Sequence, residues 1–212
     1  AIYFASYTPY FIYESGQQAG YGVGGMFKTF AHYQQFMYSY HSNLNATHPY
    51  QSSWYSWPFT IKPMWYFFNS YIAPDRISTL SASGNPAVWW VSAIGSVALL
   101  WARLSKRIAA DKALQIFCVG ILANFLPWVL VSRCTFIYHF FATVPFILMA
   151  TVYALQKLEQ RYPEAHFIKW FWVGFAVLFF VLLYPGISGL PVSAQWASFI
   201  SNLPGGKLMY GA

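Results

Sequence analysis

Long apolar segments separated by short polar connections dominate the second half of the chain. Four of them lie at residues 86–104, 113–131, 136–155 and 167–184. Each holds about 18–20 residues, enough to cross the ~30 Å hydrocarbon core of a bilayer at about 1.5 Å per residue. A further apolar run at residues 2–13 is interpreted as the end of a preceding span. The pattern predicts an all-α integral membrane fold with about four full transmembrane helices plus the end of another.

Two prolines and the tail add detail to this prediction. Pro127 and Pro145 lie inside two of the segments. We expect each to kink its helix, because proline removes an intrahelical hydrogen bond and membrane helices tolerate such kinks. The tail after Pro185 contains a short apolar run at residues 196–203, which predicts an interfacial helix or a loop.

Residues 14–85 form one large polar loop before the four segments. It begins with a Gly-rich connector at residues 14–25, and apolar side chains then recur every three or four positions, which indicates a helix. The opposite face is polar, so we predict an amphipathic helix in the membrane interface. The alternative is a helix packed on a soluble partner domain. The apolar stripe consists of Met26, Phe30, Tyr33, Met37, Tyr40 and Leu44.

The most unusual part of this loop is residues 48–58, which read His-Pro-Tyr-Gln-Ser-Ser-Trp-Tyr-Ser-Trp-Pro. The stretch is too rich in Pro and Ser to span a membrane and too aromatic to be an ordinary solvated loop. We therefore expect it to be a structured loop with a binding role. Beyond it, the sequence predicts a short helix at residues 65–72 and a loop at residues 74–85.

The composition supports a membrane protein. The 212 residues are 58% hydrophobic and 8% charged, whereas soluble domains are about 25% charged. Aromatic residues make up 22%, and Trp and Tyr favour the headgroup region. The net charge of +7 is interpreted as membrane topology, because no Lys/Arg-dense tract or RNA-binding aromatic motif is present. Nucleic acid is therefore excluded as a partner.

The basic residues predict the orientation of the chain. The connection at residues 132–135 carries only Arg133, and the positive-inside rule places the two basic connections in the cytoplasm. Residues 14–85, the Arg133 turn and the tail at residues 186–212 then share the external face. Residues 1–13 end a preceding span, and residues 86–185 form the four-helix bundle. The cytoplasmic basic residues are Arg103, Lys106, Arg107, Lys112, Lys157, Arg161 and Lys169.

Arg133 is the main candidate for binding chemistry. It stands at a predicted membrane boundary, where a guanidinium can hold a lipid phosphate through paired hydrogen bonds. The alternative is an arginine that only reaches toward lipid headgroups. Tyr138 and His139 follow within one or two helical turns and are predicted to complete the phosphate site.

Acidic and metal-binding residues are scarce. By the predicted topology, only Glu14 and Asp75 are acids on the external side. Glu14 is a candidate base, although its Gly-rich setting fits a solvated loop better. The catalytic residues therefore stay unassigned, and the base is expected upstream of this chain. Histidine spacing does not fit three or four converging ligands, so neither a metal site nor a cofactor is predicted.

Several motifs occur together in one order along the chain. The chain resembles the C-terminal four-helix region of protein O-mannosyltransferases, over residues 26–185. The residues that carry the resemblance are His48-Pro-Tyr-Gln-Ser, Trp57-Pro58, Lys62-Pro63-Met64-Trp65-Tyr66, Gly84-Asn85-Pro86 with Trp89-Trp90, and Arg133-x-Thr135-Phe136-x-Tyr138-His139.

The resemblance implies a GT-C membrane fold and an inverting transfer of mannose on the non-cytoplasmic face. The implied donor is a polyprenyl-phosphate mannose, and the acceptor is a Ser or Thr hydroxyl of a protein. The family's catalytic acidic pair belongs to an upstream half, so that half is an expected partner together with the bilayer. The short loop at residues 14–85 fits a bacterial cell-membrane member. We expect the substrate groove to be shaped by His48, Tyr50, Ser52, Trp54 and Trp57.

Other readings remain open. One is a GT-C transferase that moves another sugar to a lipid or polymer. Another is a membrane subunit without catalytic activity, or a transporter fragment. A transporter would more often show polar groups at mid-bilayer, and Asn124 is the main such residue in the predicted spans.

Overall fold

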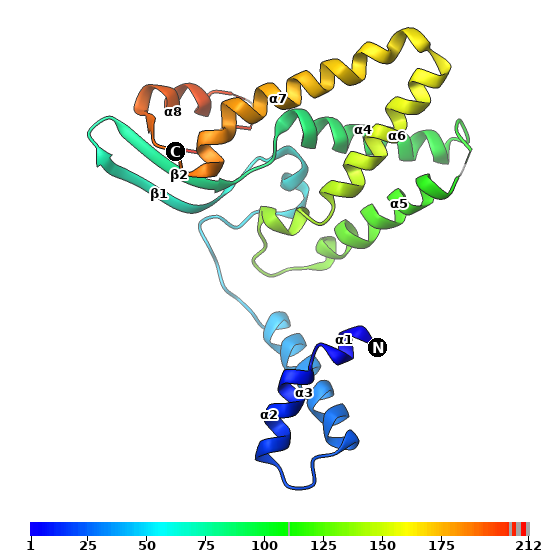
Figure 1. Cartoon of the computed structure of the whole chain (residues 1–212), viewed down its shortest axis with the longest axis vertical. Coiled ribbons are helices and arrows are strands. Elements are labelled where there is room, and N and C mark those ends of the chain that lie inside the picture. Colours follow the sequence, from blue (N-terminus) through cyan, green and yellow to red (C-terminus); the bar gives the residue numbers. More distant parts are fainter. Residues whose placement is uncertain (110, 204, 207–208, 211–212) are drawn as a thin grey trace. The chain divides into compact units, whose positions relative to one another are not determined.

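The computed structural model describes residues 1–109, 111–203, 205–206 and 209–210 (Figure 1). The chain divides into two compact units, residues 1–46 and 47–212, which are taken in turn. Both are largely helical, as the apolar pattern predicted.

The first unit contains α1 (Ile2–Ala5), α2 (Thr8–Gln17) and α3 (Val23–Ser42). The apolar run at residues 2–13 is thus divided between two helices, and α2 continues into the expected connector. Helix α3 matches the predicted amphipathic helix. Part of its apolar stripe packs on the first two helices: Phe30 meets Tyr7 with ring centroids 5.1 Å apart, and Tyr33 meets Tyr10 at 4.7 Å. Its membrane location stays a prediction.

The second unit is built on four long helices. They are α4 (Pro86–Leu104), α5 (Lys112–Phe125), α6 (Val144–Arg161) and α7 (His166–Ser188). A 3₁₀ segment, Leu126–Leu130, extends α5, and another, Pro163–Ala165, precedes α7. Among the described residues, three helices are long and apolar enough to cross a membrane: α4, α5 with its extension, and α7 with its leading turn.

The predicted span at residues 136–155 differs from the structure. Residues Ile137–Phe140 form a 3₁₀ turn, and α6 begins only at Val144. The last turns of α6 carry Lys157, Glu159 and Arg161, so its apolar part is short. The kink expected at Pro145 is wrong, because Pro145 lies in the first turn of α6, where a missing N–H costs no helical hydrogen bond. Pro127 lies in the first turn of the 3₁₀ segment that follows α5, so the regular α-helix ends just before this proline.

A small antiparallel sheet stands where the sequence predicted a short helix and a loop. Strands β1 (Met64–Ala73), β2 (Arg76–Ala82) and β3 (Val192–Ser193) are ordered β1-β2-β3, with Met64 opposite Ala82 and Arg76 opposite Ser193. Aromatic residues in β1 favour a strand. Hydroxyls of β2 bind two later segments: Ser78 donates to the carbonyl of Gly189, which caps α7, at 2.6 Å, and Ser81 donates to the Met209 carbonyl at 3.1 Å.

The start of α4 is fixed by the Gly84-Asn85-Pro86 motif. Asn85 Oδ1 accepts from the Ala87 N–H at 3.0 Å and caps the helix. Asn85 Nδ2 donates to the Ala176 carbonyl of α7 at 2.8 Å. A Cβ at position 84 would lie 2.1 Å from the Trp89 ring, so only glycine fits. These motif residues therefore join α4 to α7.

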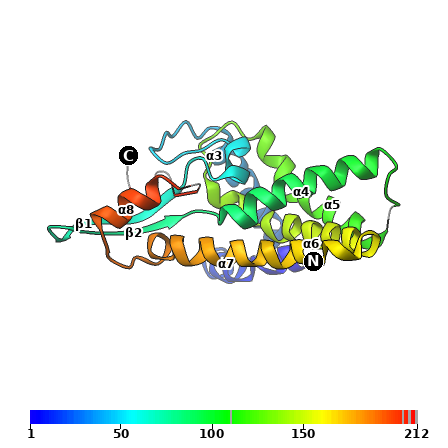
Figure 2. The ribbon, with the colours of Figure 1, turned by 90° about the horizontal axis from the view of Figure 1, so that it is seen from above.

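The connections of the second unit gather at two ends of its helices (Figure 1). The end of α4 and the start of α7 lie at one end, and Arg107 and Lys157 there sit over the rings of Trp101 and Tyr153. The 48–59 stretch, the 131–143 turn and the sheet lie at the other. Helix α8 (Ala194–Ser201) packs near this sheet, and the hairpin extends away from α4–α6 (Figure 2). Arg133 and His48 thus lie at the same end of the helices.

Candidate functional site

Two hydrogen bonds hold the His48 stretch against the Arg133 turn. The Ser52 N–H donates to the Thr135 carbonyl at 2.8 Å, and the Thr135 hydroxyl donates to the Ser52 carbonyl at 2.8 Å. Both residues are buried. The motifs that lie some eighty residues apart in sequence are therefore joined directly by hydrogen bonds through Ser52 and Thr135.

Trp57 holds this junction to the core of the second unit. Its side chain is 0% exposed, and its Nε1 donates to the Ser52 carbonyl at 3.2 Å and to Ser52 Oγ at 3.0 Å. It lies in a core cluster with Trp89, Ile137 and Phe140. Ser52 and Trp57 were predicted to shape a substrate groove. Their burial gives them a positioning role under the loop, and direct contact with a substrate stays untested.

His139 lies within an aromatic cage. Its ring stacks on Trp57 at 5.8 Å and on Tyr138 at 4.5 Å, and Trp128 meets it at 4.2 Å. Its Nδ1 lies 3.1 Å from the Phe136 backbone N and 2.9 Å from the Phe136 carbonyl oxygen. Burial lowers the pKa of His139 below its ordinary value, so the ring is neutral at pH 7. It orients the turn rather than contributing a positive charge.

Arg133 and Tyr138 form the polar part of the turn. Arg133 is half-buried, and its Nη1 donates a long hydrogen bond of 3.5 Å to the Cys134 carbonyl. Burial raises the pKa of Tyr138, Tyr66 raises it further, and the nearby Arg133 charge opposes them. Arg133 also acts on the pKa of His139. The three residues predicted to hold a phosphate are therefore close enough to interact.

His48 lies against the turn, and Tyr50 lies beside His48. The His48 ring meets Phe136 edge-on at 5.2 Å and Tyr50 at 5.5 Å. Its Nδ1 accepts from the Tyr50 N–H at 3.1 Å, so the neutral ring carries its proton on Nε2. His48 is exposed and Tyr50 is half-buried. The loop thus presents an imidazole donor beside the Arg133 turn.

Trp54, the last predicted groove residue, packs against the core. Its ring meets Phe125 at the end of α5 at 5.7 Å, and it borders the core cluster around Trp57. Like Trp57, it supports the loop. The structure therefore divides the predicted site residues into those that are exposed or half-buried around Arg133 and those, such as Ser52 and Trp57, that are packed inside.

The chain's acids take part in other contacts. Asp111 caps α5 and accepts from the Tyr153 hydroxyl at 2.6 Å, and bonds from Leu114 N–H and Tyr153 lower the pKa of Asp111. Glu159 pairs with Lys169 at 2.7 Å, the one salt bridge among the described residues. Glu14 accepts from Gln18. Arg133 is thus without a carboxylate partner in the part of the chain that is described.

Sequence reasoning missed two contributors to the site. Trp128 completes the cage around His139, and nothing in its spacing distinguishes it from the other aromatics of a membrane interface. Tyr66 was quoted only as part of a motif, yet it acts on Tyr138. Its neighbour Trp65 meets Tyr50 at 5.3 Å, which brings β1 to the site.

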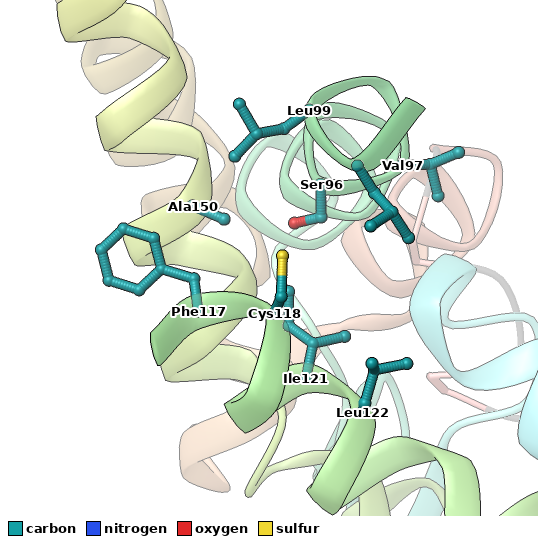
Figure 3. Close-up of a pocket in the computed structure, with 9 residues that line it drawn as sticks. Ser96, Val97, Leu99, Phe117, Cys118, Ile121, Leu122 and Ala150 are labelled. Carbon is teal, nitrogen blue, oxygen red and sulfur yellow. The ribbon is translucent and has the colours of Figure 1, made fainter. Parts of the chain in front are cut away.

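A separate small cavity lies among α4, α5 and α6 (Figure 3). It has a volume of about 80 Å³, and Ser96 and Cys118 are the polar residues that line it. Leu99, Phe117 and Ala150 line it with carbon. Its lining is almost wholly apolar, so it offers packing space rather than groups for acid–base chemistry.

Known proteins resemble this chain. Residues 26–201 match the family model described as the C-terminal four TMM region of protein-O-mannosyltransferase. A polyprenol-phosphate-mannose–protein mannosyltransferase of Mycolicibacterium smegmatis is 29% identical over 91% of this chain and 42% of its own length. The protein of the same name from Mycobacterium tuberculosis is 24% identical over 92% of the chain and 42% of its own. The chain thus spans less than half the length of these relatives.

A solved structure supports the fold. The Saccharomyces cerevisiae protein O-mannosyltransferase Pmt1-Pmt2 complex, bound to its sugar donor, matches with a TM-score of 0.64 at 19% identity. The match covers 87% of this chain and 27% of that one. The motif order, the joined loops and the family match agree. The chain therefore belongs to the family of the C-terminal four-transmembrane region of protein O-mannosyltransferases.

Proposed function

We propose that this chain is the C-terminal part of a membrane enzyme that moves mannose from polyprenyl-phosphate mannose to Ser or Thr hydroxyls of proteins. In this reaction the acceptor oxygen bonds to C1 of mannose with inversion, and the bond from C1 to the phosphate oxygen breaks. Polyprenyl phosphate leaves, and a base takes the hydroxyl proton. The names of the mycobacterial relatives support both substrates.

The observation that carries the proposal is the Arg133 turn. A leaving phosphate gains charge in the transition state, and a guanidinium without a competing carboxylate is suited to hold it. Among the described residues, Arg133 has no carboxylate partner, and the Tyr138 hydroxyl adds a hydrogen-bond donor beside it. Neutral His139 keeps the turn in shape without adding positive charge.

The exposed part of the loop suits the sugar. The Nε2–H of His48 is available as a donor to a mannose hydroxyl or a phosphate oxygen, because Nδ1 is already bonded. The rings of Tyr50 and Trp65 add apolar planes of the kind that pack on the C–H face of a sugar. We assign these residues to the donor side of the groove.

An apolar groove on α4 suits the prenyl tail. It has a volume of about 590 Å³ and is lined by Pro58, Phe59, Ala93, Ile94, Val97, Ala98 and Trp101. Pro58 and Phe59 end the His48 stretch, so the groove leads from the loop along the helix. A polyprenyl chain has only C–H groups to bury and would gain from this surface.

The base comes from the upstream half in this proposal. Three of the five acids are engaged by Gln18, Tyr153 and Lys169, and neither residues 48–58 nor residues 131–143 contain an acid. The site would face the outside of a bacterial cell membrane, as the basic connections at the opposite end indicate. The alternatives are a transferase for another sugar and a subunit without catalytic activity.

The test replaces Arg133 in the full-length protein. Arg133→Ala should lower mannose transfer about 10- to 100-fold, because hydrogen bonds to a charged group contribute about 1.5–3 kcal/mol. Arg133→Lys should recover part of the rate, since it restores the charge without the paired geometry. The measurement is transfer of radiolabelled mannose from polyprenyl-phosphate mannose to a Ser/Thr peptide.

Arg161→Ala is the matched control, because Arg161 is an exposed arginine at the other end of the helices. It should keep the wild-type rate. Unchanged transfer by Arg133→Ala would refute the phosphate anchor. If the wild-type protein does not transfer mannose from polyprenyl-phosphate mannose but transfers another sugar from its own lipid-linked donor, the alternative of a transferase for another sugar is favoured.

A further inference from the structure

The basic charge of the chain is concentrated where α4 ends. Residues 103–112 hold four cations and one carboxylate, which is a net charge of +3 out of the chain's +7. The other basic connection, at residues 157–169, holds three Lys or Arg residues and two carboxylates, and its Lys169 is paired with Glu159 at 2.7 Å. Most of the available positive charge therefore lies in one short segment. Its four cations are Arg103, Lys106, Arg107 and Lys112.

These cations are free to meet an anion. Within the described part of the chain, none of the four forms a salt bridge. The one acid among them, Asp111, is engaged elsewhere, because it caps α5 and accepts from the Tyr153 hydroxyl at 2.6 Å. Three of the cations are exposed and Arg103 is half-buried. Unpaired cations at this density attract a negatively charged ligand.

The backbone fixes two of the cations at the end of α4. The helix closes with a Schellman motif, in which the Arg107 N–H donates to the Ala102 carbonyl at 2.9 Å and the Lys106 N–H to the Arg103 carbonyl at 3.0 Å. Lys106 has a φ of 57°, the left-handed conformation that glycine usually supplies at this position. A lysine there costs backbone free energy, and strain of this kind clusters at ligand-binding sites.

Exposed apolar side chains flank the cations. The Arg107 guanidinium lies 4.2 Å from the centre of the Trp101 ring, which is 54% exposed. Leu104 in the last turn of α4 and Ile116 near the start of α5 are also exposed. Helix α4 is long and apolar enough to cross a membrane, and tryptophan favours the headgroup region. The end of α4 therefore places cations suited to a phosphate next to carbon suited to acyl chains.

We infer that the end of α4 binds an anionic phospholipid, with the headgroup phosphate held by Arg103, Lys106 and Arg107 and the acyl chains against α4 and α5. Clusters of about four to eight basic residues beside a membrane helix are typical of such binding. The lipid site is independent of the proposed mannose transfer, because it lies at the end of α4 away from the His48 stretch (Figure 1). A lipid bound there holds this end of the helix at the membrane surface.

Other anions fit the surface less well. An acidic segment of another protein or free inorganic phosphate would meet the same cations. Neither would cover Leu104 and Ile116, which a phospholipid buries with its acyl chains. The position of the cations directly after a membrane-spanning helix also favours a lipid.

The binding test uses the full-length protein in phosphatidylcholine vesicles that contain a photoactivatable phosphatidylglycerol. A phosphatidylcholine probe with the same acyl chains is the control. Mass spectrometry of the labelled peptides should find the phosphatidylglycerol probe on residues 100–116 at several times the level of the control probe. Unlabelled phosphatidylglycerol should compete, and inorganic phosphate at the same concentration should not. Equal labelling by the two probes, or equal competition by inorganic phosphate, would overturn the lipid site.

Lys106→Gly separates the charge from the fold, because glycine adopts the left-handed conformation without cost. Labelling by phosphatidylglycerol should fall about 5-fold, the usual contribution of one basic residue near an anionic lipid surface. The melting temperature should stay at or above that of the wild type. Arg107→Gln, which leaves the strained residue in place, should cause a similar loss of labelling.

Arg161→Gln is the matched control, since it removes one exposed cation from the other basic connection. Its labelling on residues 100–116 should stay close to that of the wild type. An equal loss in Arg161→Gln and Lys106→Gly would show a diffuse effect of surface charge and would overturn the site. Wild-type labelling in both Lys106→Gly and Arg107→Gln would overturn it as well.

Discussion

The two halves of the His48 stretch differ in what they do. Ser52 and Trp57 are buried and hydrogen-bonded to each other, and Ser52 is also hydrogen-bonded to Thr135. His48 and Tyr50 lie outside this junction. The His48 ring contacts Phe136 of the Arg133 turn, and the Tyr50 ring contacts His48. The buried half fixes the position of the loop, and the half with His48 and Tyr50 presents groups to a ligand. Loss of the first half should therefore affect stability, and loss of the second should affect substrate use.

The largest stability effect should come from Trp57. Trp57→Ala leaves a cavity beneath the loop and removes a hydrogen-bond donor from Ser52. We expect a loss of about 3–5 kcal/mol in the free energy of unfolding, as for other buried Trp or Phe to Ala changes. Denaturant unfolding of the full-length protein in detergent measures it. A loss below 1 kcal/mol would show that the junction is not anchored by this residue.

A smaller effect should follow from Thr135→Val. The change removes the hydroxyl donor to the Ser52 carbonyl and keeps the side-chain volume. We expect about 1 kcal/mol of destabilisation, because Trp57 Nε1 still donates to the same carbonyl. The double variant Thr135→Val/Trp57→Phe should lose more unfolding free energy than the two single variants added together. In the double variant the Ser52 carbonyl receives a hydrogen bond from neither side chain. Simple additivity would contradict the shared role.

The caged His139 predicts a dependence of stability on pH. Its folded-state pKa lies below the unfolded value of about 6.5, so the unfolded chain takes up a proton first as the pH falls. Its linkage should therefore leave stability unaffected above about pH 6.5 and lower it as the pH falls below that value. Melting temperatures at pH 7.5 and pH 5.5 measure this. His139→Phe should flatten the slope, and an unchanged slope would assign the dependence elsewhere.

The smallest stability effect should come from His48. His48→Ala removes an exposed ring, and surface changes usually stay within about 0.5 kcal/mol. Its transfer rate should nevertheless fall, by about 3- to 10-fold for one lost hydrogen bond to the donor. Melting temperature and initial rate from one preparation check both parts. Wild-type transfer would place the donor elsewhere.

The apolar pattern predicted some elements well and others poorly. Helix α4 occupies the predicted residues 86–104, because a proline start and an uninterrupted apolar run leave few alternatives. The segment at residues 136–155 was misread, since hydropathy continues through the Ile137–Phe140 turn although the backbone bends there. The β1–β2 hairpin was missed because an uncharged aromatic run fits a short helix and a buried strand equally well.

The candidate site shows the same division. The polar members, Arg133 and His48, could be chosen from the sequence because a cation and a ring donor in an aromatic loop are unusual there. The roles of Ser52 and Trp57 could not, because burial arises from the long-range pairing of residue 52 with residue 135. No local spacing encodes that contact. The basic connections predicted that both motifs share one end of the helices, and in the structure they do.

The central claim is that Arg133 holds the phosphate of the donor. The surrounding structure is expected to fold without the Arg133 side chain. Equilibrium binding of polyprenyl phosphate to full-length wild-type, Arg133→Ala and Arg133→Lys proteins tests this most directly, with melting temperatures measured on the same samples. We predict a Kd about 10- to 100-fold weaker for Arg133→Ala, an intermediate value for Arg133→Lys, and unchanged melting temperatures. An unchanged Kd for Arg133→Ala would contradict the claim.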